Sequence, residues 1–140
     1  MDGFSFLVRV YYEDTDAGGV VYHANYLRFM ERARTEWLRK LGFSQRELRE
    51  RLRVLFVVRG LRVDYRAPAR FDDELRVDSR AERGRRASLR FLQRITRPAD
   101  ETLICEAEVG IVCVDAMRFR PTALPAEIAA GLFPPESESP

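Results

Sequence analysis

The 140-residue chain is 46% hydrophobic and has a formal net charge of +2 at pH 7. A single domain of this length buries roughly two thirds of the surface of its unfolded chain, so neither a metal nor a disulfide is needed for a stable core. The basic residues are spread among acidic ones, which is not the charge pattern of a nucleic-acid-binding protein. No apolar run approaches the ~20 residues of a transmembrane helix.

The first elements in chain order are a strand, a turn and a long helix. Residues 4–12 are rich in aromatic and β-branched side chains, which predicts a strand, and the acids and glycines of residues 13–19 predict a turn. Apolar residues then recur at helical spacing, which predicts a helix over residues 23–41 with Gly42 as its C-cap. The apolar stripe comprises Tyr26, Met30, Ala33, Trp37 and Leu41.

The remainder of the chain is mostly strand. Residues 44–47 match a capping box and predict a short helix that ends near residue 52. Further along, apolar and polar side chains alternate with the period of two that is typical of a sheet with one wet face. The alternating stretches are residues 61–66, 75–80 and 87–92, and Gly84 falls where a tight hairpin would join the second and third of them.

The C-terminal part of the chain contains one more strand, a helix and a tail. Residues 103–114 are apolar on both faces, which indicates a central or covered strand. Residues 121–132 predict a short helix, and the polar, proline-rich residues 134–140 predict a disordered tail. We therefore expect one domain over residues 1–133.

These elements predict an α+β fold, because helix and strands are segregated along the chain rather than alternating. The apolar stripe of the long helix has to be buried, and the one-sided sheet is the available partner. A five-stranded antiparallel β-sheet wrapped around the long helix would bury both apolar faces. The four later strands would follow one another in hairpin-like succession.

The two cysteines indicate a reducing compartment. Cys105 and Cys113 lie eight residues apart in one predicted strand, about 26 Å at ~3.3 Å per residue. A disulfide requires Cα atoms within about 7 Å, so the two cannot pair there. The first residues, MDGFSFLVRV, do not have the pattern of a signal peptide. We expect a cytoplasmic protein with reduced thiols.

One segment carries a specific motif. Residues 11–26, YYEDTDAGGVVYHANY, are followed by FMERAR at residues 29–34. This segment strongly resembles the 4-hydroxybenzoyl-CoA thioesterase family, and within it the branch associated with the bacterial Tol-Pal envelope system. The resemblance is strongest over residues 8–43 and continues more loosely through YRAPARFDDEL at residues 65–75 and the later strands.

The resemblance implies a hotdog fold, homo-oligomers built on dimers, and hydrolysis of acyl-CoA thioesters without a cofactor or metal. Carried over by residue, Asp16 takes the place of the family's catalytic carboxylate. His23 takes the place of the histidine found in this branch, and its backbone N–H would polarise the thioester carbonyl at the start of the central helix. Tyr12 matches a tyrosine proposed to assist.

The chemistry of thioester hydrolysis suits these residue types. A carboxylate such as Asp16 is ionised at neutral pH and can act as nucleophile or as base for water. A helix N-terminus offers unpaired N–H groups to a developing oxyanion. His23 is the only histidine and could orient substrate or water, or protonate the departing thiolate. Gly18 and Gly19 would let the backbone approach the substrate.

Simpler interpretations exist for the same residues. Taken without its motif, Asp16 would be a turn or cap residue and His23 a structural histidine. The acidic run has calcium-like spacing, but Asn25 stands where the bidentate glutamate would be needed, so we expect no metal. Glu31 could be catalytic, although a surface or interface role is favoured for it.

Binding of coenzyme A would also require cations for its phosphates, and only Lys40 among the 24 basic residues is a lysine. Six arginines stand at predicted strand ends, and the sequence does not choose among Arg66, Arg70, Arg83, Arg85, Arg86 and Arg97. An acyl carrier protein could replace coenzyme A as the thiol carrier. Two other functions stay open at this point: a hotdog hydratase or dehydratase, and a non-catalytic acyl-thioester-binding module.

Overall fold

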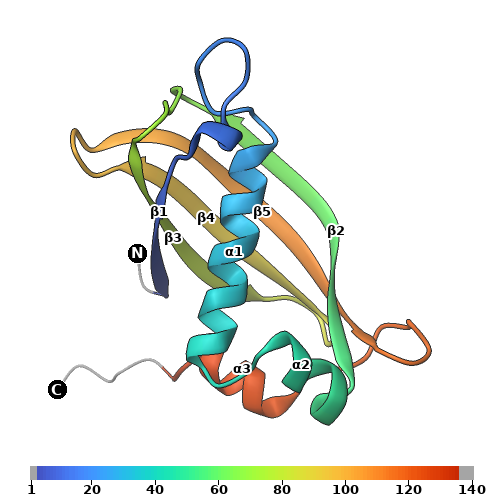
Figure 1. Cartoon of the computed structure of the whole chain (residues 1–140). Helices are drawn as coiled ribbons and strands as arrows, with labels where there is room; N and C mark the ends of the chain where they lie inside the picture. Colours follow the sequence, from blue (N-terminus) through green and yellow to red (C-terminus); the bar gives the residue numbers. More distant parts are fainter. Residues whose placement is uncertain (1–2, 136–140) are drawn as a thin grey trace, which may run out of the picture.

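A long helix lies across one face of a five-stranded antiparallel sheet, as the sequence predicts (Figure 1). The computed structural model describes residues 3–135. Its strands are β1 (Phe4–Arg9), β2 (Val54–Tyr65), β3 (Glu74–Arg83), β4 (Ser88–Arg97) and β5 (Thr102–Asp115). Its helical segments are the 3-10 turn η1 (Tyr12–Asp14), α1 (Asn25–Lys40), α2 (Gln45–Glu47), the π-helical turn η2 (Leu48–Leu52) and α3 (Ala126–Leu132).

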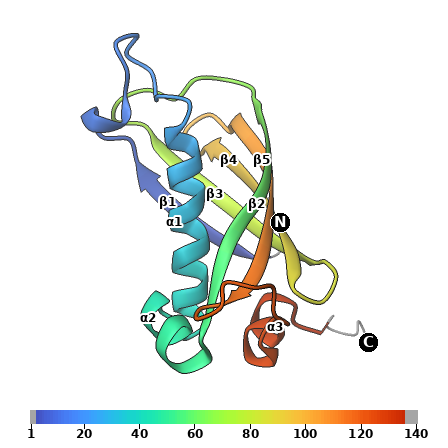
Figure 2. The same ribbon diagram turned by 90° about the vertical axis from the view of Figure 1, so that its right-hand side faces the viewer.

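The core forms between α1 and the concave face of the sheet. Tyr26, Met30, Ala33 and Trp37 of the predicted stripe are buried, and the Trp37 ring packs 5.8 Å from that of Phe91 on β4. Figure 2 shows the sheet curving around α1, with α2 and α3 gathered at the C-terminal end of that helix. Gly42 ends α1 with a φ of 101°, a left-handed conformation that glycine adopts without strain. This confirms the hotdog architecture.

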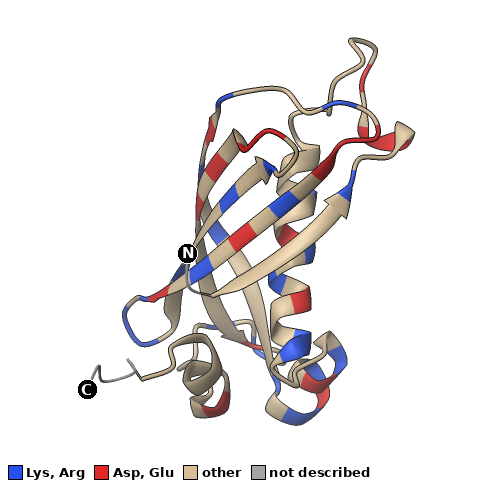
Figure 3. Ribbon diagram, turned by 90° about the vertical axis from the view of Figure 1, so that its left-hand side faces the viewer, with Lys and Arg blue, Asp and Glu red and all other residues tan. Residues whose placement is uncertain are grey.

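The outer face of the sheet carries charged side chains that pair with one another across strands. Charges of both signs alternate along the strands in Figure 3. Glu106 on β5 pairs with Arg66 at 3.1 Å and with Arg94 on β4 at 3.6 Å. Because these opposite charges pair with each other and remain in contact with water, the outer face is stable in solvent and needs no covering layer.

The strand connectivity differs from the predicted hairpin succession. The order in the sheet is β1-β3-β4-β5-β2, so β2 does not pair with β3 but with β5, from Val54↔Asp115 to Tyr65↔Cys105. In addition, β2 begins at Val54, seven residues before the predicted start at residue 61. The prediction missed these residues because apolar and polar side chains do not alternate in the first half of the strand. The chain therefore crosses from one edge of the sheet to β3, and β2 forms an edge strand.

Two further predictions concern the ends of the chain. The first strand ends at Arg9 instead of residue 12, and the chain then turns into η1. The predicted tail lies outside the described residues from residue 136 onward. Within residues 3–135, no helix has the length and hydrophobicity to cross a membrane.

Candidate active site

Asp16 lies at the base of a short hairpin loop that projects beyond the N-terminal end of α1 (Figure 1). The loop is closed by the Asp16 N–H, which donates to the Val20 carbonyl at 2.9 Å, and by the Gly19 N–H, which donates to the Asp16 carbonyl at 3.0 Å. The exposed Asp16 carboxylate accepts the Gly18 N–H at 2.8 Å through Oδ1. Within residues 3–135 no donor binds Oδ2, so this oxygen faces solvent with its lone pairs free.

The glycines of this loop have different physical roles. A Cβ built on Gly18 would lie 3.2 Å from Asp16 Oδ1, a distance tighter than ordinary packing. Gly19 has a φ of 79°, which most side chains disfavour. Gly18 therefore permits the close approach to the carboxylate, and Gly19 permits the turn.

Asp14, two residues before Asp16, has the opposite environment. It is 5% exposed, and its Oδ2 accepts the Tyr11 N–H at 2.8 Å. Its Oδ1 accepts Nδ2 of Asn25, the first residue of α1, at 2.6 Å. Asp14 thus ties η1 to the start of α1. In the sequence, only the place of Asp14 in the acidic run of residues 13–16 indicates that it has a particular role.

The backbone just before α1 is held by two hydrogen bonds. The Tyr22 carbonyl accepts the Asn25 N–H at 2.7 Å, and the His23 carbonyl accepts the Tyr65 hydroxyl at 3.1 Å. In the part of the chain that the structure describes, neither the His23 N–H nor the Ala24 N–H has an acceptor. Two donors at the positive end of the helix dipole are therefore available to an anion or a polarised carbonyl.

Three predicted catalytic residues come to the same end of the molecule without touching one another. The exposed His23 ring lies 4.7 Å from that of Tyr22 and 6.1 Å from that of Tyr65. Tyr12 is 79% exposed in η1 and packs edge-on against Phe71 at 5.4 Å. No hydrogen bond among the described residues joins the side chains of Asp16, His23 and Tyr12. Each is open to an incoming ligand.

The cysteines do not provide a nucleophile. Burial raises the pKa of the Cys105 thiol to about 12 and that of Cys113 to about 11, so both stay protonated at neutral pH. Both are free and buried, as the sequence predicted. Residues 3–135 contain no cluster of three or more histidine, cysteine, aspartate or glutamate side chains placed to bind a metal ion.

The structure narrows the set of arginines that could bind phosphate. Arg97 pairs with Asp73 at 3.0 Å and with Asp100 at 3.1 Å, and Arg66 pairs with Glu106. The Arg83 guanidinium lies 4.7 Å from the Phe133 ring. Arg85 and Arg86 are neighbours in the exposed turn between β3 and β4, and neither takes part in an ion pair within residues 3–135. Arg70, at the opposite end of the sheet, also forms no ion pair within these residues.

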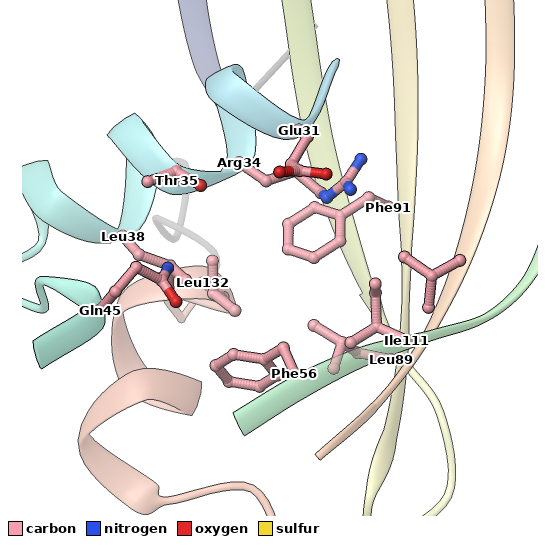
Figure 4. Close-up of a pocket in the computed structure, with 11 residues that line it drawn as sticks. Glu31, Arg34, Thr35, Leu38, Gln45, Phe56, Leu89, Phe91, Ile111 and Leu132 are labelled. Carbon is pink, nitrogen blue, oxygen red and sulfur yellow. The ribbon is translucent and has the colours of Figure 1, made fainter. Parts of the chain in front are cut away.

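A cavity of about 360 Å³ lies beside the C-terminal half of α1 (Figure 4). Its apolar lining comes from α1, α3 and the concave face of strands β2, β4 and β5, and comprises Leu38, Leu132, Phe56, Val58, Leu89, Phe91 and Ile111. Its polar lining comprises Glu31, Arg34, Thr35 and Gln45. Glu31 is exposed there, in agreement with the favoured surface role. No motif or spacing in the sequence distinguishes Arg34 from Arg32 of the same FMERAR segment.

This chain is similar to known thioesterases both in sequence and in fold. Residues 10–132 match the family model of the thioesterase-like superfamily. The chain is 56% identical to the acyl-CoA thioester hydrolase YbgC of Escherichia coli, over 91% of this chain and 93% of that protein. It is 49% identical to the acyl-CoA thioesterase YbgC of Haemophilus influenzae, over 92% of this chain and 93% of that protein.

Solved structures show the same architecture. A probable thioesterase from Bartonella henselae is 36% identical and superposes with a TM-score of 0.81, over 86% of this chain and 98% of that one. A 1,4-dihydroxy-2-naphthoyl-CoA thioesterase from Synechocystis has a TM-score of 0.89 over 96% of this chain and 98% of that one. At 21% identity, the second similarity concerns the fold alone.

Proposed function

The chain belongs to the thioesterase-like superfamily and hydrolyses acyl-CoA thioesters, and from that premise we propose that Asp16 performs the reaction at the start of α1. The observation that carries the proposal is the shared location of two features. A carboxylate with one free oxygen and two backbone N–H groups without acceptors lie at the same end of the molecule. Hydrolysis needs both a base or nucleophile and a site for the oxyanion.

In the proposed reaction, the thioester carbonyl oxygen accepts the N–H groups of His23 and Ala24. Asp16 either takes a proton from the water that attacks the carbonyl carbon, or attacks that carbon itself to give an anhydride that water then opens. In both routes negative charge develops on the carbonyl oxygen, where the helix dipole stabilises it. The C–S bond breaks and the thiolate leaves. His23 and Tyr12 are placed to orient the ligand or supply a proton to the thiolate.

The test uses the purified protein with a panel of acyl-CoAs, a thiol-detecting reagent and the absorbance of an enoyl group. Release of free thiol with unchanged enoyl absorbance is expected. An enoyl change without thiol would establish a hydratase, and retained binding with neither signal would establish a binding module. The same panel presented on acyl carrier protein decides which carrier is used.

We also propose a homodimer that pairs through β2. This 12-residue edge strand leaves one row of backbone groups unpaired and exposes Val58, Leu61 and Tyr65 at 46–49%. Long apolar edge strands are rarely left open in water. Antiparallel pairing of two β2 strands would bring the Tyr65 end of one protomer beside the Val54 end of its partner, so that each active site is completed by its neighbour. A stable, active monomer in sedimentation would contradict this arrangement.

For the phosphates of coenzyme A, we propose Arg85 and Arg86. Both guanidinium groups lack an ion-pair partner in residues 3–135, and the φ of 33° at Arg86 is an unusual backbone conformation of the kind found at binding sites. Their turn lies near the N-terminal end of β2, since Cys113, which pairs with Phe56, donates its N–H to the Ala87 carbonyl at 2.7 Å. In the proposed dimer, this end meets the partner's active site.

Cellular context is a further proposal. The motif of residues 11–34 supports membership of the branch associated with the Tol-Pal system, and the reduced cysteines support a cytoplasmic location. Fractionation of cells that carry a tagged copy tests the location. Co-purification of the tagged protein with Tol-Pal components tests the association, and their absence from the eluate would contradict it.

A further inference from the structure

Arg34 is held in a fixed position at the edge of the 360 Å³ cavity (Figure 4). Its Nη1 donates to Gln93 Oε1 at 2.8 Å, and its guanidinium carbon lies 5.9 Å from the Phe91 ring centroid. Gln93 is only 2% exposed, and its Nε2 donates to the Met30 carbonyl at 3.0 Å and to Ser79 Oγ at 2.9 Å. Because the amide nitrogen is fully used, the amide oxygen must face Arg34.

The charge of Arg34 is not balanced by an ion pair. None of the ion pairs formed within residues 3–135 includes it. Burial lowers the pKa of Arg34, and the charge of Glu31 one turn earlier opposes that change only from a distance. A guanidinium has five N–H donors in a planar fork, and one of them is used by Gln93. The remaining donors suit the two oxygens of a carboxylate.

We propose that this cavity receives the acyl group and that Arg34 selects acyl groups that end in a carboxylate, that is, monothioesters of dicarboxylic acids. The proposal rests on the proposed thioesterase function and on the β2-paired dimer, which brings the partner's helix start toward this cavity. An engineered apolar cavity of roughly 150 Å³ holds one benzene, so a space of about 360 Å³ accepts a short chain with its terminal carboxylate. The methylene groups contact Phe56, Leu89 and Ile111, and the carboxylate accepts from Arg34.

Glutaryl-CoA and pentanoyl-CoA form the matched substrate pair, since they have the same number of acyl carbons and differ in the terminal carboxylate. We expect kcat/KM to be higher for glutaryl-CoA, and we expect Arg34→Gln to lower the ratio of the two values at least 10-fold. Arg32→Gln removes the same charge from an exposed position of α1 and should leave the ratio unchanged. An unchanged ratio in Arg34→Gln, or a wild-type preference for pentanoyl-CoA, would overturn the proposal.

A binding measurement separates this proposal from the catalytic one. Glutarate should bind the wild-type protein in calorimetry, pentanoate should bind more weakly, and Arg34→Gln should lose the difference. Arg34→Lys keeps the charge without the planar fork and should retain part of the difference between glutarate and pentanoate binding. This variant serves as a control for a folding defect in Arg34→Gln. If no acyl-CoA releases thiol but glutarate still binds through Arg34, the proposed function fails and the cavity assignment stands.

Glu31→Gln provides the opposite test. This variant removes the negative charge beside the cavity, so it should tighten glutarate binding and raise the glutaryl-CoA preference. Weaker glutarate binding in Glu31→Gln would show that Glu31 is needed to hold Arg34 in place, and would overturn the assignment of Arg34 as a free carboxylate-binding group.

Discussion

The two ends of α1 offer different chemistry. At the N-terminal end, the candidate functional groups are exposed, and hydrogen bonds hold the backbone around them, such as the bond that the Tyr65 hydroxyl donates to the His23 carbonyl. At the C-terminal half, a cavity lined by apolar side chains contains one fixed cation, Arg34. Arg34 lies nine residues after Asn25, the first residue of α1, which is about 14 Å along the helix at ~1.5 Å per residue. A short acyl group does not span this distance within one protomer.

The separation of these two ends would give the proposed dimer a function. Antiparallel pairing of β2 would place the reactive end of one protomer beside the cavity of the other, so a single substrate would use both. The monomer then contains two half-sites rather than one complete site. Substitutions at each end of α1 test this division.

Asp16→Asn is expected to have the largest effect. The change keeps size and a hydrogen-bond acceptor for Gly18 but removes the negative charge, so kcat should fall by at least ~100-fold with little change in KM or melting temperature. His23→Ala should lower kcat by less, since its backbone N–H remains. Glu13→Gln, which removes an exposed charge from the neighbouring η1, is the matched control and should keep wild-type turnover. Full activity of Asp16→Asn with a lowered melting temperature would make Asp16 a turn residue only.

Asp14→Ala should have the opposite signature, although the residue is only two positions away. Removal of the buried carboxylate leaves the Asn25 amide and the Tyr11 N–H without acceptors. The Asn25 side chain is buried and the Tyr11 N–H is partly buried. A buried polar group left unsatisfied costs about 1–3 kcal/mol, so the free energy of unfolding should fall by about 3 kcal/mol. Denaturant unfolding measures this loss, with Asp16→Ala as the control that changes little. Equal stability of the two alanine variants would contradict the division between a structural and a reactive aspartate.

Much of the fold could be predicted from the sequence, because its signals are local. The stripe on α1, the cap at Gly42 and the alternation of β3 and β4 each depend on neighbouring residues. The placement of β2 could not be predicted in this way, since the partner of an edge strand lies far along the chain and residues 54–60 lack a polar alternation. Hairpin succession was the simplest assumption; it is confirmed for β3, β4 and β5 and is wrong only for β2, which pairs with β5 instead of β3.

Only part of the arrangement of the candidate site could be predicted from the sequence, for the same reason. Asp16 and His23 lie in one contiguous motif, and the structure places them at one end of α1. The residues that hold the candidate groups in place come from distant parts of the sequence. Tyr65, which binds the His23 carbonyl, is on β2, and Gln93, which orients Arg34, is on β4. No spacing rule in the sequence links these residues. The contrast between Asp14 and Asp16 likewise depends on burial, which the sequence of two acids separated by one residue does not reveal.

Tyr65→Phe is expected to have a moderate effect at the reactive end. The hydroxyl donates to the His23 carbonyl, so its loss frees the peptide group whose N–H belongs to Ala24. A hydrogen bond contributes about 0.5–1.5 kcal/mol, so kcat should fall by roughly 2- to 13-fold with KM nearly unchanged. Tyr11→Phe is the control, because the Tyr11 hydroxyl makes no hydrogen bond within residues 3–135. A rise in KM with kcat unchanged would show that Tyr65 contacts substrate instead of positioning the helix start.

The pH dependence of this contact follows from the same environment. Burial raises the pKa of Tyr65 above its usual value near 10, so the hydroxyl keeps its proton and remains a donor throughout the neutral and mildly alkaline range. The kcat ratio of wild type to Tyr65→Phe should therefore stay constant from pH 6 to about pH 9. A ratio that falls toward one between pH 6 and about pH 9 would indicate that the hydroxyl ionises in this range, which would contradict the raised pKa of Tyr65.

The smallest expected effect concerns the phosphates of coenzyme A at the cavity end. If Arg85 and Arg86 bind these phosphates, salt should weaken the contact equally in the ground state and the transition state, because the phosphates do not react. Raising the salt concentration from low to high should thus increase KM by about threefold, with kcat unchanged. The double change Arg85→Gln and Arg86→Gln should raise KM at low salt and remove most of this dependence. The same two charges removed from the outer face of the sheet, in Arg80→Gln with Arg94→Gln, should leave the salt dependence intact. A KM that does not respond to salt in the wild type would instead favour recognition through apolar contacts or through a carrier protein.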